Sequence, residues 1–336
     1  ALQWVLIPGV AENLMKNRLF SLVRESCARV AGLARSVSIR QDLIGDYVAS
    51  LPIEKALNPV MDTENHFCDD PEAALVYFLV LDCINFGSGW FNELDLEPGC
   101  ANGYFTISSR LKRDFINRGS YSAGFLQQMS AEECCRIFGQ RHDNPAAFQL
   151  MNLFAAALRD FGDLLQRNFS GSCRELVLSS GHSASELGNR LLKMPFYRDI
   201  FPYAGRDVCL LKRVQITASD LHIAFKGSGY GRFDDIADLT IFADNLVPHV
   251  LMLDGILQYS AALAGAIAAG QSLASGSDEE IELRACCIHA VELMREELAR
   301  RNVTVTSQGL DYLLWNRGLD EKYARTPSHV TRCVFY

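Results

Sequence analysis

Residues 143–169 read DNPAAFQLMNLFAAALRDFGDLLQRNF, and this stretch decides the fold class. Asn144 and Pro145 form a typical helix start, because asparagine accepts an N–H of the first turn and proline is tolerated there. Apolar side chains then recur every three or four positions, at Phe148, Met151, Phe154, Ala155, Leu158, Phe161 and Leu165. This period predicts a long amphipathic helix with one buried face.

Helix signals recur along the chain, whereas strand signals are few. Asp70 and Pro71 repeat the start device, and Ser-x-x-Glu capping boxes stand at Ser130/Glu133, Ser183/Glu186 and Ser277/Glu280. GYFTIS (103–108) fits a short strand, and CLLKRVQI (209–216) fits either a strand or a helix. We therefore expect a mainly α fold with few short strands. It forms one compact helical domain over residues 1–336, and a division into two lobes stays open.

The charge balance disfavours binding along a nucleic-acid polymer. Lys and Arg number 32 against 40 Asp and Glu, which gives a net charge of −8. Proteins that bind DNA or RNA backbones neutralise many phosphates with clustered basic residues. We therefore expect no polymeric nucleic-acid partner, although a local basic pocket for one phosphate fits the composition.

The cysteines and histidines predict neither a metal site nor disulfides. The 11 cysteines include no Cys-x-x-Cys pair, and no His-x3-5-His spacing of a zinc site occurs. The N-terminal ALQWVLIPGVAE lacks the basic segment of a signal peptide. YSAALAGAIAAG (259–270) is too short to cross a bilayer and predicts a core helix. We expect a reduced cytoplasmic protein with no membrane partner, metal or cofactor.

The segment LTIFADNLVPHVLM (239–252) holds a carboxylate between two apolar runs. Asp244 is either a helix cap, with Pro248 in the first turns, or a catalytic group at a helix start. The local sequence favours the cap. Asp234 and Asp235 fit a cap for a helix over 236–242, which leaves Asp238 and Asp244 to be explained by pairing or function.

Three other segments carry groups that could bind a ligand. Lys212 precedes a Gly-x-Gly-x-Gly turn that matches neither the P-loop nor the dinucleotide fingerprint, so a plain tight turn is favoured. Asn85, Phe86 and Trp90 follow an apolar helix, where they fit either heterocycle binding or core packing. Asp311 and Trp315 share a helix face because they are four residues apart. The tail HVTRCVFY is expected to pack onto the body.

Seven segments between residues 81 and 336 resemble the queuosine salvage proteins, the queuosine 5′-phosphate N-glycosylases. In chain order they are LDCINFGSGWF, GYF, LLKRVQI, KGSGYGRFDDIADLTIFADNLVPHVL, ELRACCIHAVELM, LDYLLWN and HVTRCVFY. The resemblance implies a fold similar to that of the helix–hairpin–helix DNA glycosylases. It also implies hydrolysis of queuosine 5′-monophosphate to queuine and ribose 5-phosphate, with the queuine salvaged for tRNA modification.

The resemblance changes how Asp244 is interpreted. A carboxylate near the anomeric carbon stabilises an oxocarbenium-like transition state and can activate water, so catalysis becomes the favoured role. Asp238 is the second catalytic candidate, and Asp235 or Asp238 is expected to accept N–H groups of the guanine-like edge. The remaining expected substrate contacts are Asn85, Phe86, Trp90, Lys212, Phe233, Asp311, Trp315, His329 and Arg332. Within this set, Lys212 and Arg332, with His329 beside them, are the candidates for the 5′-phosphate.

Two other functions remain open at this point. A DNA or RNA base-excision glycosylase would flip a base out of a polymer and would need a basic face, which the net charge of −8 disfavours. A non-catalytic queuine or nucleotide-binding protein would retain its ligand without releasing ribose phosphate.

Overall fold

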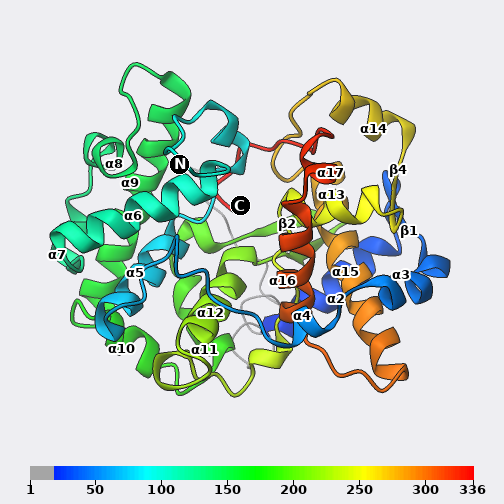
Figure 1. Ribbon diagram of the computed structural model, residues 1–336, viewed down its shortest axis with the longest axis horizontal. Coiled ribbons are helices and arrows are strands. Elements are labelled where there is room, and N and C mark those ends of the chain that lie inside the picture. Colours follow the sequence, from blue (N-terminus) through cyan, green and yellow to red (C-terminus); the bar gives the residue numbers. More distant parts are fainter. Residues whose placement is uncertain (1–18) are drawn as a thin grey trace.

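The computed structural model describes residues 19–336 and is mainly helical, as expected (Figure 1). The expectation about the N-terminal segment 1–12 lies outside the described residues. The helices are α2 (Leu19–Ala31), α3 (Ile44–Ser50), α4 (Glu54–Leu57), α5 (Pro71–Cys83), α6 (Gly103–Arg118), α7 (Ala123–Gln127), α8 (Ala131–Phe138), α9 (Pro145–Asn168), α10 (Cys173–Leu178), α11 (Ala184–Leu191), α12 (Lys212–Ala224), α13 (Leu246–Leu253), α14 (Ala261–Ala268), α15 (Asp278–Arg300), α16 (Ser307–Gly318) and α17 (Glu321–Ala324). Within residues 19–336, no helix is long and apolar enough to cross a membrane.

The predicted caps stand at the observed helix starts. The Asn144 side chain accepts the Ala147 N–H at the start of α9, and Asp70 accepts the Ala73 N–H at the start of α5. The serine of each predicted capping box accepts the N–H of its glutamate, at Ser130, Ser183 and Ser277. These bonds satisfy N–H groups that have no partner inside the helix.

The strands form two small antiparallel sheets. β1 (Val37–Ile39) pairs with β4 (Leu257–Tyr259), and Val37 lies opposite Tyr259. β2 (Ile200–Tyr203) and β3 (Arg206–Cys209) form a hairpin in which Ile200 lies opposite Cys209. Few short strands were expected, and this is confirmed.

Two local expectations were wrong. GYFTIS begins helix α6, because Asn102 caps it by accepting the Phe105 N–H, and Ile107, Leu111 and Phe115 form its buried side. The 259–270 segment is not a core helix: α14 lies at the periphery, and within it only Leu263 and Ile267 are buried (Figure 1). The ambiguous 209–216 segment divides, with β3 ending at Cys209 and α12 beginning at Lys212.

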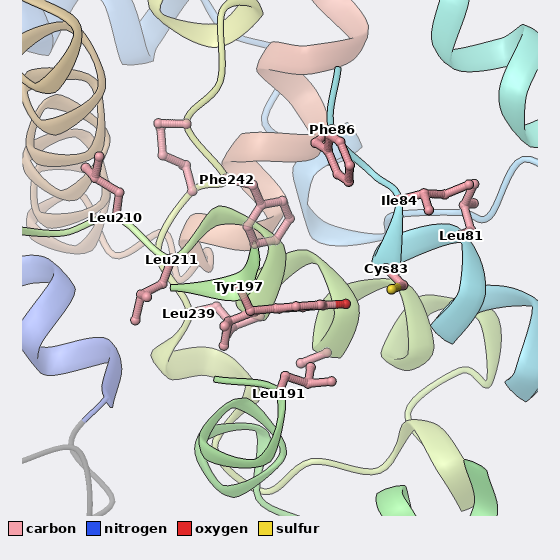
Figure 2. Close-up of a cluster of buried hydrophobic side chains, with 14 of the residues drawn as sticks. Leu81, Cys83, Ile84, Phe86, Leu191, Tyr197, Leu210, Leu211, Leu239 and Phe242 are labelled. Atoms are coloured by element: carbon pink, nitrogen blue, oxygen red, sulfur yellow. The ribbon is translucent and has the colours of Figure 1, made fainter. Parts of the chain in front are cut away.

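Two groups of helices stand side by side in Figure 1, with α5 to α10 in one group and α2, α3, α13, α15 and α16 in the other. Helix α12 packs against α5 and α11, while α15 packs against α2 and α13. The buried apolar side chains form one connected cluster that reaches both groups. Figure 2 shows part of this core, where Phe86, Tyr197 and Phe242 come from three distant segments.

The last residues of the chain pack back onto the body, as expected. The Gly87 N–H donates to the Tyr336 carbonyl at 2.9 Å, and the Leu273 N–H donates to the Val330 carbonyl at 2.9 Å. The Tyr336 ring is buried against the Arg284 guanidinium, 4.4 Å from its carbon. This docking places the tail against the loop that follows α5.

Candidate active site

A cavity of about 500 Å³ is lined by residues of both helix groups, with α6 of one and α16 of the other, and its lining runs from residue 60 to residue 336. Its carboxyl groups are Asp62, Asp220, Asp244 and Asp311, and its aromatic side chains include Phe86, Tyr104, Phe105 and Trp315. Lys212 is the one lysine or arginine in the lining formed by residues 19–336. The cavity therefore combines flat apolar surfaces with acidic groups and a single cation.

Asp244 lies just before α13, with Asn245 between the two. Its Oδ1 accepts the Leu246 N–H at 2.8 Å, so one oxygen caps the first turn. Its Oδ2 lies 3.9 Å from Lys212 Nζ, and both side chains line the cavity.

Lys212 is held by the loop that follows α5. It is the first residue of α12 and is only 5% exposed, and its Nζ donates to Asn85 Oδ1 at 3.2 Å. Burial lowers the pKa of Lys212, and the Asp244 carboxylate opposes this shift. Asn85 thus aims the lysine toward Asp244.

Asp311 and Trp315 both line the cavity from one face of α16, as their spacing predicted. Asp311 Oδ1 accepts the Phe242 N–H at 2.8 Å. The pKa of Asp311 is raised to about 7, chiefly by burial; the Phe242 bond opposes this shift and the nearby Asp244 adds to it. The Tyr104 and Phe105 rings meet Trp315 edge to face, with centroids 5.9 and 6.0 Å away.

A pair of carboxyl groups was missed by the sequence reasoning. Asp82, near the end of α5, is fully buried and is hydrogen-bonded to Asp220 on α12, which lines the cavity. Asp82 Oδ1 accepts the Asn85 Nδ2–H at 3.3 Å, whereas no N–H or O–H donor from residues 19–336 reaches Oδ2. Burial raises the pKa of Asp82 to about 7 and that of Asp220 well above its ordinary value. The sequence did offer one indication of this pair, because Asp82 is the one charged residue in the apolar run 73–91.

Ser88 is a second residue that the sequence reasoning missed. It lines the cavity, and its buried Oγ has no hydrogen-bond partner among residues 19–336. Gly87 precedes it with a φ of +104°, a left-handed conformation that favours glycine, and a 3-10 turn over Ser88–Glu93 follows. A buried hydroxyl without a partner at a cavity wall is available to a ligand.

Three expected site residues on the segment before Asp244 lie outside the cavity lining. Asp235 accepts the Ser183 hydroxyl and the Ala184 and Ser185 N–H groups, so it caps α11 rather than a helix over 236–242. Asp238 is exposed, and Phe233 is buried in the core. The structure therefore does not bring these three side chains together with the residues that line the cavity.

Three further expected residues, Trp90, His329 and Arg332, lie outside the cavity lining. Trp90 Nε1 donates to Gln149 Oε1 at 3.1 Å, and the exposed Arg332 pairs with Glu93 while lying over the Trp90 ring. His329 is buried, and burial lowers its pKa to about 3, so it is neutral near pH 7. A neutral histidine and an exposed arginine outside the lining do not support the expected phosphate contacts.

Half of the expected residues do meet at the cavity: Asn85, Phe86, Lys212, Asp244, Asp311 and Trp315. Over residues 19–336, no group of three or more His, Cys, Asp or Glu side chains is placed to hold a metal ion. All 11 cysteines are free thiols. The cavity lining itself offers carboxyl groups, one lysine and aromatic rings.

The fold and the cavity together define a mainly α-helical protein with a recessed site for a small aromatic and polar ligand. Comparison with known proteins then gives the family. The family model described as queuosine salvage protein matches residues 65–336, and the chain belongs to this family.

Curated relatives support this membership, and three of them carry the name queuosine 5′-phosphate N-glycosylase/hydrolase. The protein from Sphaerobacter thermophilus is 33% identical over 92% of this chain and 95% of its own length. That from Dictyostelium discoideum is 31% identical over 94% of this chain and 99% of its own length. That from Mus musculus is 32% identical over 79% of this chain and 82% of its own length.

Proposed function

We propose that this chain hydrolyses the N-glycosidic bond of queuosine 5′-monophosphate and releases queuine and ribose 5-phosphate. The observation that carries the proposal is the Asp244–Lys212 pair, which spans 3.9 Å at the wall of an aromatic-lined cavity. The names of the curated relatives specify the same bond and substrate. The released queuine is then available for tRNA modification.

Asp244 is the proposed catalytic carboxylate. The bond between the base and the ribose breaks with positive charge developing on the sugar, and an ionised carboxylate at the cavity wall stabilises that charge. The same group accepts a proton from the attacking water. Lys212 orients the second oxygen of Asp244, which lies 3.9 Å from its Nζ, while Asp244 Oδ1 accepts the Leu246 N–H at the start of α13.

The base is proposed to lie between aromatic rings and the carboxyl groups. Queuine is a 7-deazaguanine without N7, so assistance to the departing base must come through other edge atoms. Asp311 and Asp220 replace Asp235 and Asp238 in this role, because they line the cavity. Burial raises the pKa of Asp311 to about 7, so this carboxyl group can donate as well as accept near neutral pH. Trp315 and Phe86 supply stacking surfaces.

The 5′-phosphate is proposed to contact Ser88 and Lys212 rather than Arg332. Ser88 offers an unpartnered hydroxyl at the wall, and Lys212 is the available cation of the described lining. The net charge of −8 supports a mononucleotide substrate over a polymer. The free thiols support a reducing cytoplasmic setting.

The test compares queuosine 5′-monophosphate, the free nucleoside and queuosine-containing tRNA, with products identified by mass spectrometry. The mononucleotide should be cleaved far faster than the other two. Asp244→Asn should lose about 10²–10³-fold in turnover, as expected when one preorganised stabiliser is removed. Arg332→Ala is the matched control and should retain turnover, because that side chain lies outside the cavity lining. Release of ribose phosphate by Asp244→Asn at the wild-type rate would reject the assignment.

A further inference from the structure

A fully buried ion pair lies behind the proposed catalytic residues. Arg284, on α15, is 0% exposed, and Asp199, just before β2, is 2% exposed. The guanidinium donates to both carboxylate oxygens, at 2.9 Å to Oδ1 and 2.5 Å to Oδ2. Such a two-bond arrangement fixes orientation as well as distance.

Each partner also holds the backbone of a proposed catalytic segment. Asp199 Oδ2 accepts the backbone N–H of Lys212 at 3.1 Å, at the first residue of α12. Arg284 Nε donates to the carbonyl of Ala243 at 2.9 Å, one residue before Asp244. The ion pair is therefore a direct bridge between the main chains that carry the lysine and the aspartate.

The lysine side of this bridge is under backbone strain. Leu211, immediately before α12, has a φ of +54°, a left-handed conformation that is unfavourable for a branched side chain. The Asp199 carbonyl accepts the Leu210 N–H at 3.0 Å and the Leu211 N–H at 3.4 Å. Asp199 thus holds the strained turn through its main chain and the helix start through its carboxylate. Strain of this kind persists only where the surroundings hold it in place.

We propose that Asp199 and Arg284 are positioning residues that set the spacing between Lys212 and Asp244. This inference rests on the proposed function, because the spacing matters only if those two side chains act on a substrate. Neither Asp199 nor Arg284 lines the cavity, so they act through the two backbones. A displacement of about 1 Å in a catalytic group can cost about 100-fold in rate.

The test uses two conservative variants. Asp199→Asn keeps the side-chain shape but removes one of the two carboxylate charges on the guanidinium, since Glu280 Oε1 also accepts from Arg284 Nη1 at 3.2 Å. Arg284→Lys keeps a cation but loses the two-bond arrangement and the donor to Ala243. For each variant, kcat and KM for queuosine 5′-monophosphate are measured at a temperature where unfolding curves show the protein folded. We expect kcat to fall about 10- to 100-fold, with KM changed less than about threefold, because the binding walls remain intact.

The matched control is Asp114→Asn. Asp114 is also a buried carboxylate with arginine partners, at 3.1 Å from Arg136 and 3.2 Å from Arg118, but it lies on α6 outside the cavity lining. It should lose stability and keep kcat. If Asp199→Asn or Arg284→Lys is folded and keeps the wild-type kcat, or raises only KM, the positioning role is overturned. If the wild type itself releases no queuine, the proposed function fails instead.

Discussion

Asp311→Asn should make the protein more stable at neutral pH while removing a group from the cavity. The pKa of Asp311 rises from an ordinary 3.8 to about 7, chiefly because the carboxyl is buried. Between these values the folded chain keeps a proton that the unfolded chain releases. The free energy of unfolding therefore falls by about 1.4 kcal/mol for each pH unit, or by about 4 kcal/mol over the whole interval.

The sign of this effect follows from the direction of the shift. Stability contributed by a raised acid pKa is fully present below the unfolded pKa and is lost as the pH rises through the folded pKa. Asparagine cannot ionise, and its Oδ1 can still accept the Phe242 N–H that Asp311 accepts at 2.8 Å. The variant should therefore gain over the wild type by about 2 kcal/mol at pH 5.5 and by about 4 kcal/mol at pH 8.

The assay is urea unfolding of both proteins at these two pH values, followed by circular dichroism. The decisive quantity is how much the gain changes between pH 5.5 and pH 8, because pH-independent effects of the substitution cancel in that comparison. A gain that is equal at the two pH values would refute the reasoning, since Asp311 would then be ionised throughout. Turnover should fall in the same variant, because a destabilising buried carboxyl is retained where chemistry uses it.

Three further predictions concern other parts of the molecule. Asp254→Asn should cost about 1–3 kcal/mol of unfolding free energy at pH 7, because it removes the acceptor charge for Arg317 and Lys322. These hydrogen bonds lower the pKa of Asp254 against the opposing effect of burial, so the cost should shrink as the pH falls toward 3. Thermal unfolding measured across this pH range tests the prediction. Gly309→Ala should lower the free energy of unfolding by about 1–3 kcal/mol, because a Cβ at this position would lie 2.1 Å from the Ala56 carbonyl oxygen. Gly265→Ala on α14 should not destabilise the protein, because its Cβ would meet nothing within 4 Å. Denaturant unfolding of both variants compares the two effects. Turnover should survive EDTA, since no metal-ligand spacing occurs; activity lost with EDTA and restored by zinc would contradict this.

The sequence predicted those parts of the structure that depend on neighbouring residues. The caps at Asn144 and Ser277 and the shared face of Asp311 and Trp315 are set within four residues, and the structure has them. Asp82 and Asp220 meet only because α5 packs against α12, and no local pattern encodes that contact. The prediction that Asp235 caps a helix over 236–242 was wrong for the same reason, because the helix that it does cap lies about fifty residues earlier in the chain.

The residues that form the cavity come from distant parts of the sequence, and this determines when during synthesis the cavity can form. Its walls run from Val60 to Tyr336, with α12 and α16 between them. A nascent chain therefore lacks part of the wall until residues 328–336 have left the ribosome and docked beside Gly87. Cleavage of the glycosidic bond therefore requires that the whole cavity wall has folded. Refolding monitored by queuine release should lag behind the recovery of helical signal, by the time that the tail takes to find its place.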